Sequence, residues 1–512
     1  MSKKTKKINK PVKILHFLFI LFCAMTVVFS FMSFTTGFGK IFAGHTPDYY
    51  DLVFTDRIRN LCISGIWLCL SIIVYLIAKS RYISSSHSER SAMIIIALFS
   101  FAVRAFFVVL LGKNVSPVSD FANAWQMTKG DFFYLSHYKF FPAYINYAVF
   151  MRLIARFFNY NFLSVLWSNA IMGSLTTVGV FLLAKEVFNK DSVSVTAAVL
   201  YAFYPASVLY TLINTPEHLC VLAMVFGLYF FLKAVKLQKP VMSFVYALIF
   251  GILAGISNSM KSFYPVVLVA VVIMLLFVLL SNRFSPKKLF IAVLILVCVI
   301  GAETITMKGI SSVSGKLFNM EIDYSAALPH FVFVGLNRQG EGQINLGNIS
   351  RTFNDLIESG VDADTAKETA LEEFKNDWKG HLKEIPSFTV RKLIWGFQDD
   401  CSPARLLAIS INGDNQQGLS ASVTDLLLSS SKEVSQIFYC LLCALCLIAS
   451  VSIYKSGEKN LNVFFIELVI WGYFCLILLS ESQSRYKCLI LPYLIITAAS
   501  LNKKGFSKSK DN

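Results

Sequence analysis

The sequence predicts an all-helical protein that crosses a membrane about twelve times. Of its 512 residues, 55% are hydrophobic and 15% are charged, whereas about a quarter of the residues in an ordinary soluble domain are charged. The mean hydropathy is +0.60. Apolar runs of about 20 residues recur along most of the chain, and each is long enough to cross a hydrocarbon core ~30 Å thick. These observations exclude a soluble globular fold.

Twelve apolar runs have the length and composition of transmembrane helices. The first follows a basic segment, and because no small-residue cleavage site ends it, we expect a retained membrane anchor and not a cleaved signal peptide. The twelve predicted spans cover residues 14–35, 60–78, 91–112, 162–184, 192–212, 217–234, 241–258, 263–281, 289–307, 434–454, 461–480 and 488–501.

The distribution of basic residues predicts the orientation of the chain. The net charge is +16, and basic clusters lie at residues 3–13, 233–239, 283–288 and 503–504. With the N-terminus inside, all four clusters fall on the cytoplasmic side, as the positive-inside rule requires. We therefore expect a plasma membrane protein with both termini in the cytoplasm. Anionic lipids at the cytoplasmic rim, and not nucleic acid, are the expected partner of this charge.

This topology divides the chain into four parts. Residues 1–90 hold the basic N-terminus and an additional transmembrane hairpin, and residues 91–308 form a transmembrane core. Within that core, residues 113–161 form an outer loop, which we expect to contain interfacial helices. Residues 309–433 are expected to form a small mixed extracytoplasmic domain. Residues 434–512 supply the last transmembrane helices and a basic tail.

Asp120 is the most informative polar residue of the outer loop. The residues Ser-Pro-Val-Ser at 116–119 end the third span, and the residues after Asp120 can begin another helix. One interpretation is that Asp120 only caps this short helix. The other is that an acid at the outer mouth of a membrane protein serves as a general base on a lipid-borne substrate.

Five further ionisable residues are predicted at the same outer face. A lysine there can simply extend its ammonium toward water, and an acid can simply start a helix. Together, however, acids and cations around a polar cavity suit transfer from a phosphate-activated donor. The cations bind the departing phosphate, while a carboxylate takes a proton from the attacking hydroxyl. The five residues are Lys139, Glu217, Lys261, Arg485 and Lys487.

Arg104 is expected inside the third predicted span. A charge at that depth is costly unless it is paired or wetted, so Arg104 is a functional candidate, here for the donor phosphate. The alternative is that its side chain extends outward to the interface.

A series of short motifs runs through the chain in the order Arg104, Ser119-Asp120-Phe, Lys139-Phe-Phe-Pro, Pro216-Glu217-His-Leu, Glu481-Ser-Gln-Ser-Arg485-Tyr and Leu491-Pro492. Over about residues 91–500, this series resembles the polytopic GT-C glycosyltransferases. The protein O-mannosyltransferases and the lipid A aminoarabinose transferases are the branches it resembles most. Those enzymes have a catalytic acid in the first large outer loop, an outer soluble domain and a polyprenyl-phosphate sugar donor.

The resemblance implies a GT-C-like core in which Asp120 is the general base. It also implies that Lys139 and Arg485 contact the donor phosphate. The outer loop has no second acid next to Asp120, as some branches do, and Glu217 is the candidate for that part.

Residues 329–345 resemble a stretch at the start of the outer domain in bacterial members. Arg338 and Glu341 in this stretch would suit a sugar or an acceptor. Turn formation alone also explains the glycines around them.

We expect an inverting glycosyltransferase that moves a sugar from a polyprenyl phosphate to an extracytoplasmic acceptor, which is a cell-wall polymer, a glycolipid or a protein. No cofactor is required, no residue is assigned to a metal, and a divalent metal is left open. Asp362 and Asp364 match the Asp-x-Asp pattern of nucleotide-sugar sites, but they open a predicted helix and are better explained by capping. The Lys-rich, Phe-rich composition, with Cys401 alone in the outer domain, is typical of a low-GC Gram-positive bacterium.

Two alternatives stay open. A polysaccharide polymerase or ligase would share the cationic outer site. A transporter or flippase of lipid-linked saccharides would also need about twelve spans. Transporters, however, concentrate ionisable groups and broken helices near the middle of the bilayer, whereas the polar residues here are predicted at the rim.

Overall fold

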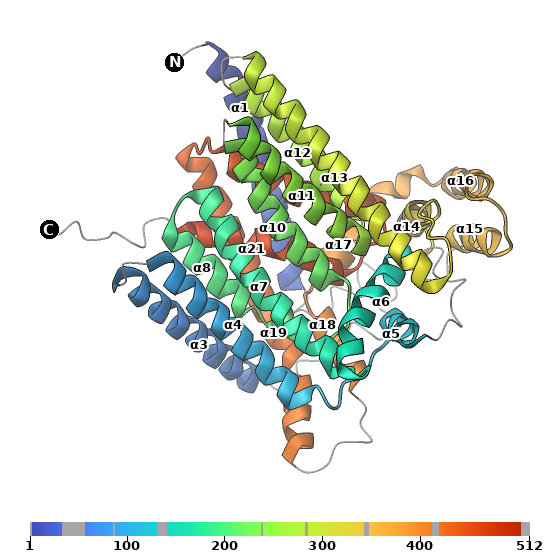
Figure 1. The fold of residues 1–512 in the computed structure, drawn as a ribbon, viewed down its shortest axis with the longest axis horizontal. Helices are drawn as coiled ribbons and strands as arrows, with labels where there is room; N and C mark the ends of the chain where they lie inside the picture. The colour runs from blue at the N-terminus through green and yellow to red at the C-terminus, as the bar shows by residue number, and fades with distance from the viewer. Residues whose placement is uncertain are drawn as a thin grey trace.

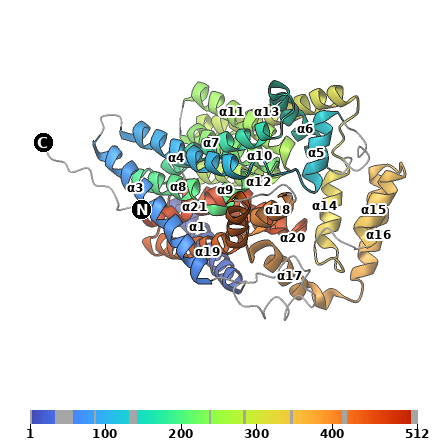
Figure 2. The same ribbon diagram turned by 90° about the horizontal axis from the view of Figure 1, so that it is seen from below.

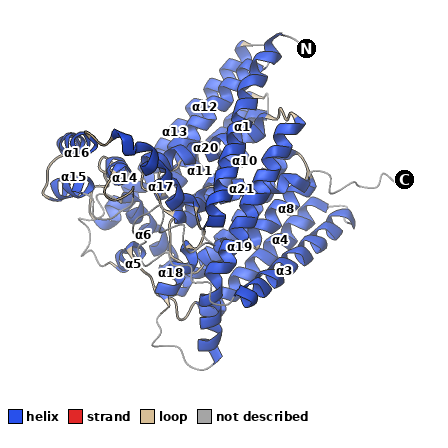
Figure 3. Ribbon diagram, turned by 180° about the vertical axis from the view of Figure 1, so that it is seen from behind, coloured by secondary structure: helices blue, strands red, loops and turns tan. Residues whose placement is uncertain are grey.

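The computed structural model describes residues 3–32, 57–84, 88–130, 141–236, 239–281, 285–342, 348–411 and 419–502. Within these ranges every regular element is a helix, and the β contact that occurs is an isolated bridge between Val115 and Ile411 (Figure 3). The predicted all-helical class is confirmed.

Nine helices in the described part of the chain are long and apolar enough to cross a membrane. The prediction of a multi-pass membrane protein is therefore confirmed, whereas the number twelve is not. The nine helices are α1 (Lys3–Met32), α3 (Arg57–Ser84), α4 (Ser88–Leu111), α7 (Leu163–Phe188), α10 (Glu217–Lys236), α11 (Pro240–Met260), α13 (Pro286–Phe318), α19 (Leu419–Ser456) and α20 (Leu461–Leu479).

Three of the predicted spans are shorter helices in the structure. The predicted span 192–212 divides into α8 (Asp191–Ala202) and α9 (Pro205–Tyr210), because Pro205 lacks the N–H that would continue the first helix. The other two are α12 (Tyr264–Ser281) and α21 (Leu491–Ala499), the latter followed by the short helix η7 (Ser500–Asn502).

Small residues bring α11 and α13 into close contact. A Cβ added at Gly251 would lie 2.6 Å from the Cβ of Ala302, and one added at Gly255 would lie 2.7 Å from the Cβ of Thr306. Lipid provides no hydrophobic driving force between helices, so close backbone approach of this kind stabilises their packing. α10 packs against α11, and α7 packs against α10, so these helices lie side by side in the bundle (Figure 1).

The first two long helices share α19 as a neighbour and otherwise pack against different helices. α1 lies along α19 and α20, whereas α3 lies along α4, α8 and α19 (Figure 2). His16 of α1 contacts Glu467 of α20 at 2.5 Å between Nδ1 and Oε2, and both side chains are buried. The N-terminal part of the chain is therefore joined to the last helices of the bundle.

The outer loop contains two helices, as predicted. α5 (Asp120–Lys129) and α6 (Pro142–Ala155) pack against each other, and α6 also contacts α11 and α13. Tyr147 and Ile145 of α6 are buried, so the aromatic face of this helix lies against protein. The short helix η3 (Arg156–Phe158) follows, and its Phe157 and Phe158 are exposed, as aromatic residues at a membrane interface are.

The predicted mixed character of residues 309–433 is wrong for the described part of this segment, which is helical. Its apolar residues recur at helical spacing, as Phe353 and Ile357 do in α15, where both are buried. α15 and α16 project from the bundle beside α14 (Figures 1 and 2). The elements are α14 (Ala327–Leu336), α15 (Asn348–Glu358), α16 (Ala363–Trp378), η4 (Leu382–Glu384), α17 (Ile385–Phe397) and α18 (Ser402–Ser410).

Asp362 has the capping role that the sequence predicts. Its side chain accepts hydrogen bonds from the backbone N–H groups of Asp364 and Thr365, at 3.2 and 3.0 Å, where α16 begins. These contacts satisfy two amides that have no partner within the helix. The hydrogen bonds of Asp362 are therefore those of a helix cap.

Candidate functional site

Asp120 is the first residue of α5. Ser119 occupies the N-cap position, with a φ of 54° and a ψ of −144°, and no side chain caps the helix there. The structure therefore differs from the expected capping role of Asp120, because the helix begins one residue earlier than such a role requires, at Asp120 itself. The carboxylate belongs to the first turn, where the helix dipole favours a negative charge.

A cavity of about 100 Å³ lies beside Asp120, among α5, α6, α14, α20 and the segment that follows α20. It brings together Asp120, Lys261 and Arg485, three residues that the sequence analysis assigned to the site and that lie far apart in the chain. The cavity is larger than the ~10–15 Å³ that one water needs, so polar groups in it can be hydrated. Aromatic rings line much of the wall, namely Phe141, Tyr144, Tyr324, Phe331, Tyr473 and Tyr486.

Arg485 is held by aromatic rings in the helix η6 (Ser484–Leu489), which connects α20 to α21. Its guanidinium carbon lies 5.5 Å from the centre of the Phe121 ring and 5.1 Å from that of Tyr486. Burial lowers the pKa of Arg485, but Tyr486, Tyr144 and nearby carboxylates raise it well above its usual range. The residue therefore carries a permanent positive charge in the cavity.

Glu481 is a cavity residue that the sequence analysis did not assign. The hydroxyl of Tyr486 donates a hydrogen bond to Oε2 of Glu481 at 2.6 Å, and Nη2 of Arg485 donates to the same hydroxyl at 3.3 Å. The tyrosine therefore connects the acid to the cation. The signal was present in the sequence, because Glu481 lies four residues before Arg485 in the same connection.

Glu217, at the start of α10, does not line the cavity but contacts Lys261, which does. Its Oε1 is 3.6 Å from Nζ of Lys261, and its other oxygen accepts a hydrogen bond from the hydroxyl of Thr215. Glu217 is 3% exposed. The Lys261 ammonium lies 4.0 Å from the centre of the Tyr486 ring. In this arrangement Glu217 orients Lys261 and does not line the cavity itself.

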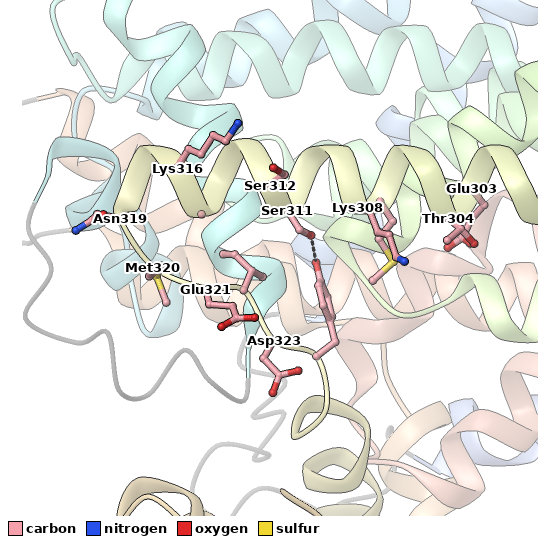
Figure 4. Close-up of a pocket in the computed structure, with 14 residues that line it drawn as sticks. Glu303, Thr304, Lys308, Ser311, Ser312, Lys316, Asn319, Met320, Glu321 and Asp323 are labelled. Atoms are coloured by element: carbon pink, nitrogen blue, oxygen red, sulfur yellow. Dashed lines mark hydrogen bonds between the residues drawn. The ribbon is translucent and has the colours of Figure 1, made fainter. Parts of the chain in front are cut away.

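A polar groove of about 880 Å³ adjoins the cavity (Figure 4). It follows the C-terminal half of α13 and the segment 319–324, and Tyr324 lines both the groove and the cavity. The side-chain amide of Asn146 donates to the Tyr324 hydroxyl at 2.6 Å, and the Ser311 hydroxyl lies 3.2 Å from it. Polar residues form most of the groove, namely Glu303, Thr304, Lys308, Ser311, Ser312, Lys316, Asn319, Glu321 and Asp323.

Residues 145–303 match the family model described as dolichyl-phosphate-mannose-protein mannosyltransferase. The predicted resemblance to the GT-C glycosyltransferases is confirmed. The matched residues include Glu217 and Lys261, whereas Asp120 and Arg485 lie outside them. No match was found among curated proteins.

Among solved structures, this chain is similar to the oligosaccharyltransferase of Archaeoglobus fulgidus. One structure is AglB in complex with an inhibitory peptide and a dolichol-phosphate, with a TM-score of 0.42, 14% identity, and coverage of 81% of this chain and 50% of that one. Another is tethered with an acceptor peptide containing the NVT sequon, with a TM-score of 0.42, 14% identity, and coverage of 81% and 49%. This chain spans about half the length of these structures.

Two of the residues assigned to the GT-C-like site lie elsewhere. Lys487 is 2% exposed, and its ammonium donates to the carbonyls of Gly396 and Asp399, where α17 ends. Arg104 is fully buried, and it donates to the Ser100 hydroxyl at 2.6 Å and the Ala202 carbonyl at 3.2 Å. Lys487 therefore caps a helix, and Arg104 joins α4 to α8. Neither lines the cavity.

The two outer-domain candidates are held in ion pairs. Arg338 contacts Asp377 at 3.1 Å and Glu384 at 3.2 Å. Glu341 contacts Nε of Arg391 at 3.1 Å. These contacts hold the segment after α14 against α16 and α17, and neither residue lines the cavity or the groove. Lys139 lies outside the described residues.

Lys392 of α17 is a buried cation that the sequence analysis missed. Its ammonium donates to the carbonyls of Gly335, Leu478 and Ser480 at 2.6, 2.8 and 2.9 Å. Burial lowers the pKa of Lys392 to about 7. Since Ser480 lines the cavity, Lys392 supports the wall of the site from behind.

Proposed function

We propose that this protein is an inverting glycosyltransferase that moves a sugar from a polyprenyl phosphate to a hydroxyl of an extracytoplasmic acceptor. One observation carries the proposal. Asp120, Lys261 and the pair Glu481 and Arg485 come from three separate parts of the chain, and all four residues line one cavity. The match of residues 145–303 to a mannosyltransferase family model supports the same reaction class.

The donor phosphate is assigned to Arg485 and Lys261. The planar guanidinium of Arg485 can contact two phosphate oxygens at once, while Lys261 supplies a point charge. Both groups lie against aromatic rings, so little reorganisation is needed when negative charge develops on the leaving phosphate. Preorganised cations of this kind stabilise a transition state more than they stabilise the ground state.

The proton of the acceptor hydroxyl is assigned to Asp120. The acceptor oxygen attacks the anomeric carbon on the face opposite the phosphate and forms the new C–O bond. The bond between the anomeric carbon and the phosphate oxygen breaks, and its electron pair stays on the phosphate. The hydroxyl proton moves to the Asp120 carboxylate. One displacement of this kind inverts the configuration of the anomeric carbon.

The acceptor is assigned to the groove along α13. Ligand sites usually enclose about 300–1,000 Å³, and the groove of about 880 Å³ falls in this range while the cavity of about 100 Å³ does not. The hydroxyl, amide and carboxylate groups of the groove suit a hydroxyl-rich chain. A polymerase or ligase would differ from this proposal only in taking a lipid-linked acceptor.

A transporter is the less favoured function. Arg104 and His16 lie within candidate spans, and each is bonded to a local partner, Ser100 and Glu467 respectively. The groups assigned to the sugar donor gather at one end of the bundle, near α5 and α14 (Figure 1). We therefore assign the site to the outer face of a bacterial plasma membrane, with both termini in the cytoplasm.

A deletion strain tests the proposed function. The sugar composition of its wall polymers, glycolipids and surface proteins would be compared with that of the parent. We expect one polymer to lack one sugar, which returns with the wild-type protein and with Asp364→Asn, a change at an exposed acid of α16, but not with Arg485→Ala. Unchanged sugar on every polymer, together with no binding of polyprenyl-phosphate sugars by the purified protein, would reject the proposal.

A further inference from the structure

A second polar pocket lies at the opposite end of the molecule from the candidate site. Its volume is about 660 Å³. The N-terminal end of α1, which contributes to it, lies far from α5 and α14 (Figure 1). The lining residues are Lys10, Lys13, Ile14 and Phe17 of α1, with Tyr454, Gly457 and Lys459 from the end of α19 and the connection to α20.

The pocket is positioned at the boundary of the membrane. Lys10 is the first residue of the candidate span Lys10–Met32, and Lys459 lies between the candidate spans Leu426–Ser456 and Leu461–Leu479. α1 packs along α19. Two segments that are far apart in sequence therefore bring their lysines together where both leave the hydrocarbon core.

The pocket carries three positive charges and no lining carboxylate. Lys10, Lys13 and Lys459 are exposed, and none of them forms an ion pair with another described residue. Glu458 lies between the lining residues Gly457 and Lys459 but does not line the pocket itself, and its Oε1 accepts hydrogen bonds from the backbone N–H groups of Lys459 and Asn460, at 3.2 and 3.3 Å. The cluster is therefore complementary to a phosphate group.

Contacts of α1 with α19 and α20 hold the walls of this pocket together. His16 lies one turn beyond Lys13 on α1, and its contact with Glu467 at 2.5 Å attaches α1 to α20. The rings of Phe17 and Tyr454 lie 6.4 Å apart, centre to centre, and attach α1 to α19. The pocket is thus formed by the fold before any ligand binds, so a ligand there has little ordering cost to overcome.

The wall below the lysines is apolar. Ile14 is 51% exposed and Phe17 is 49% exposed, and both lie deeper in the candidate span than Lys10 and Lys13. A free phosphate would contact the lysines alone. A phospholipid would contact the lysines with its headgroup and these side chains with an acyl chain.

We propose that this pocket binds the headgroup of an anionic phospholipid, with the ammonium groups of Lys10, Lys13 and Lys459 around its phosphate and an acyl chain along Ile14 and Phe17. The sequence predicts anionic lipids around the whole basic rim, and this proposal assigns one of them to a single pocket. It is independent of the proposed glycosyl transfer, because it lies at the other end of the bundle.

Lipid titration of the purified full-length protein tests this site. Phosphatidylglycerol would be added to the protein in neutral detergent, with phosphatidylcholine as the uncharged comparison. Native mass spectrometry would count bound lipids, and thermal unfolding would be followed in parallel. We expect a discrete phosphatidylglycerol adduct and a rise in Tm, because a ligand of the folded state stabilises it. Equal binding of phosphatidylcholine would overturn the proposal.

The test variant is Lys10→Gln/Lys13→Gln/Lys459→Gln. The matched control is Lys239→Gln/Lys287→Gln/Lys288→Gln, which removes the same charge from lysines that lie outside the pocket, at the starts of α11 and α13. A lysine near an anionic surface changes affinity by about fivefold. We therefore expect the test variant to bind phosphatidylglycerol about 10- to 100-fold more weakly than the control.

Two further results would overturn the proposal. An equal loss in the control would mean that general surface charge binds the lipid. A rise in Tm with inorganic phosphate alone as large as that with the lipid would mean a free-anion site. If the test variant fails to fold, Lys10→Arg/Lys13→Arg/Lys459→Arg and the single change Lys13→Gln decide the matter. The arginine variant must retain phosphatidylglycerol binding, and the single variant must lose about fivefold.

Discussion

The guanidinium carbon of Arg485 lies 5.5 Å from the centre of the Phe121 ring, and Phe121 directly follows Asp120. This contact connects the cation assigned to the donor phosphate with the helix that carries the proposed base. Phe121 is 1% exposed, and Nδ2 of Asn214 donates to its carbonyl at 2.8 Å. A buried aromatic ring therefore anchors the start of α5 beside Arg485.

Phe121→Leu should keep α5 buried and remove the cation–π contact. Such a contact in a desolvated site contributes about 1–2 kcal/mol, so we expect kcat/KM to fall about 5- to 30-fold with little change in Tm. Steady-state kinetics and thermal unfolding measure the two effects. Phe106→Leu, at an exposed ring of α4, serves as the control. A kcat/KM equal to that of the control would separate Phe121 from the site.

Arg485→Ala should raise the KM for the donor and lower kcat, because the charge that meets the leaving phosphate is removed. Arg485→Lys should recover activity in part, since an ammonium cannot reproduce a two-point contact. Kinetics with a polyprenyl-phosphate sugar measure both constants. Arg351→Ala changes an exposed arginine of α15 and should behave as the wild type. Full activity in Arg485→Ala would leave Lys261 as the phosphate contact of the cavity.

Lys392 should make stability depend on pH. The unfolded chain keeps the proton on this lysine up to a pH of about 10.4, whereas in the folded protein its pKa is lowered to about 7. Between these values the unfolded state binds more protons, so the contribution of Lys392 to the free energy of unfolding becomes more favourable as pH rises. In Lys392→Met the free energy of unfolding should lack this increase with pH.

Thermal unfolding of the wild type and Lys392→Met from pH 7 to pH 9.5 measures the difference. Lys367→Met, at a half-exposed lysine of α16, should follow the wild type. Parallel Tm curves for the wild type and Lys392→Met would show that Lys392 keeps the same charge in both states.

The outer domain should be accessible from outside the cell. Cys401 is fully buried and cannot report on this, so the probe is Lys367→Cys on α16. We expect an impermeant thiol reagent to label it in whole cells. Labelling that appears only after lysis would place α16 in the cytoplasm and reverse the topology. The wild-type chain, with its own cysteines, supplies the background.

Hydropathy and charge predicted much of the fold because the bilayer restricts the solutions. Within the described residues, helices occupy most of each of the twelve predicted spans. The common depth of three connections in the membrane predicted that Asp120, Lys261 and Arg485 lie at one level. The division of the predicted span 192–212 at Pro205 was missed, although the proline is visible in the sequence. The helical spacing of Phe353 and Ile357 was also present in residues 309–433, but the mixed character predicted for this segment did not take it into account.

The depth of a residue in the membrane did not predict the direction in which its side chain points. Lys487 lies two residues after Arg485, yet its ammonium turns to the carbonyls at the end of α17. Arg338 meets Asp377, which is remote in sequence. The partner of each of these side chains is a carbonyl or an acid that the tertiary fold brings near it. The order of residues in the sequence does not show which group that is.

Activity of Asp120→Asn tests the central claim most directly. The amide keeps the size of the carboxylate, and no side-chain cap is lost because Asp120 does not occupy the N-cap position. We expect normal expression and Tm with sugar transfer reduced about 10²-fold or more, the scale of losing a positioned base. Asp120→Glu should recover little, because a displacement of about 1 Å costs much of the rate. Asp364→Asn should transfer at the wild-type rate. Transfer by Asp120→Asn at the wild-type rate would contradict the assignment of Asp120 as the base.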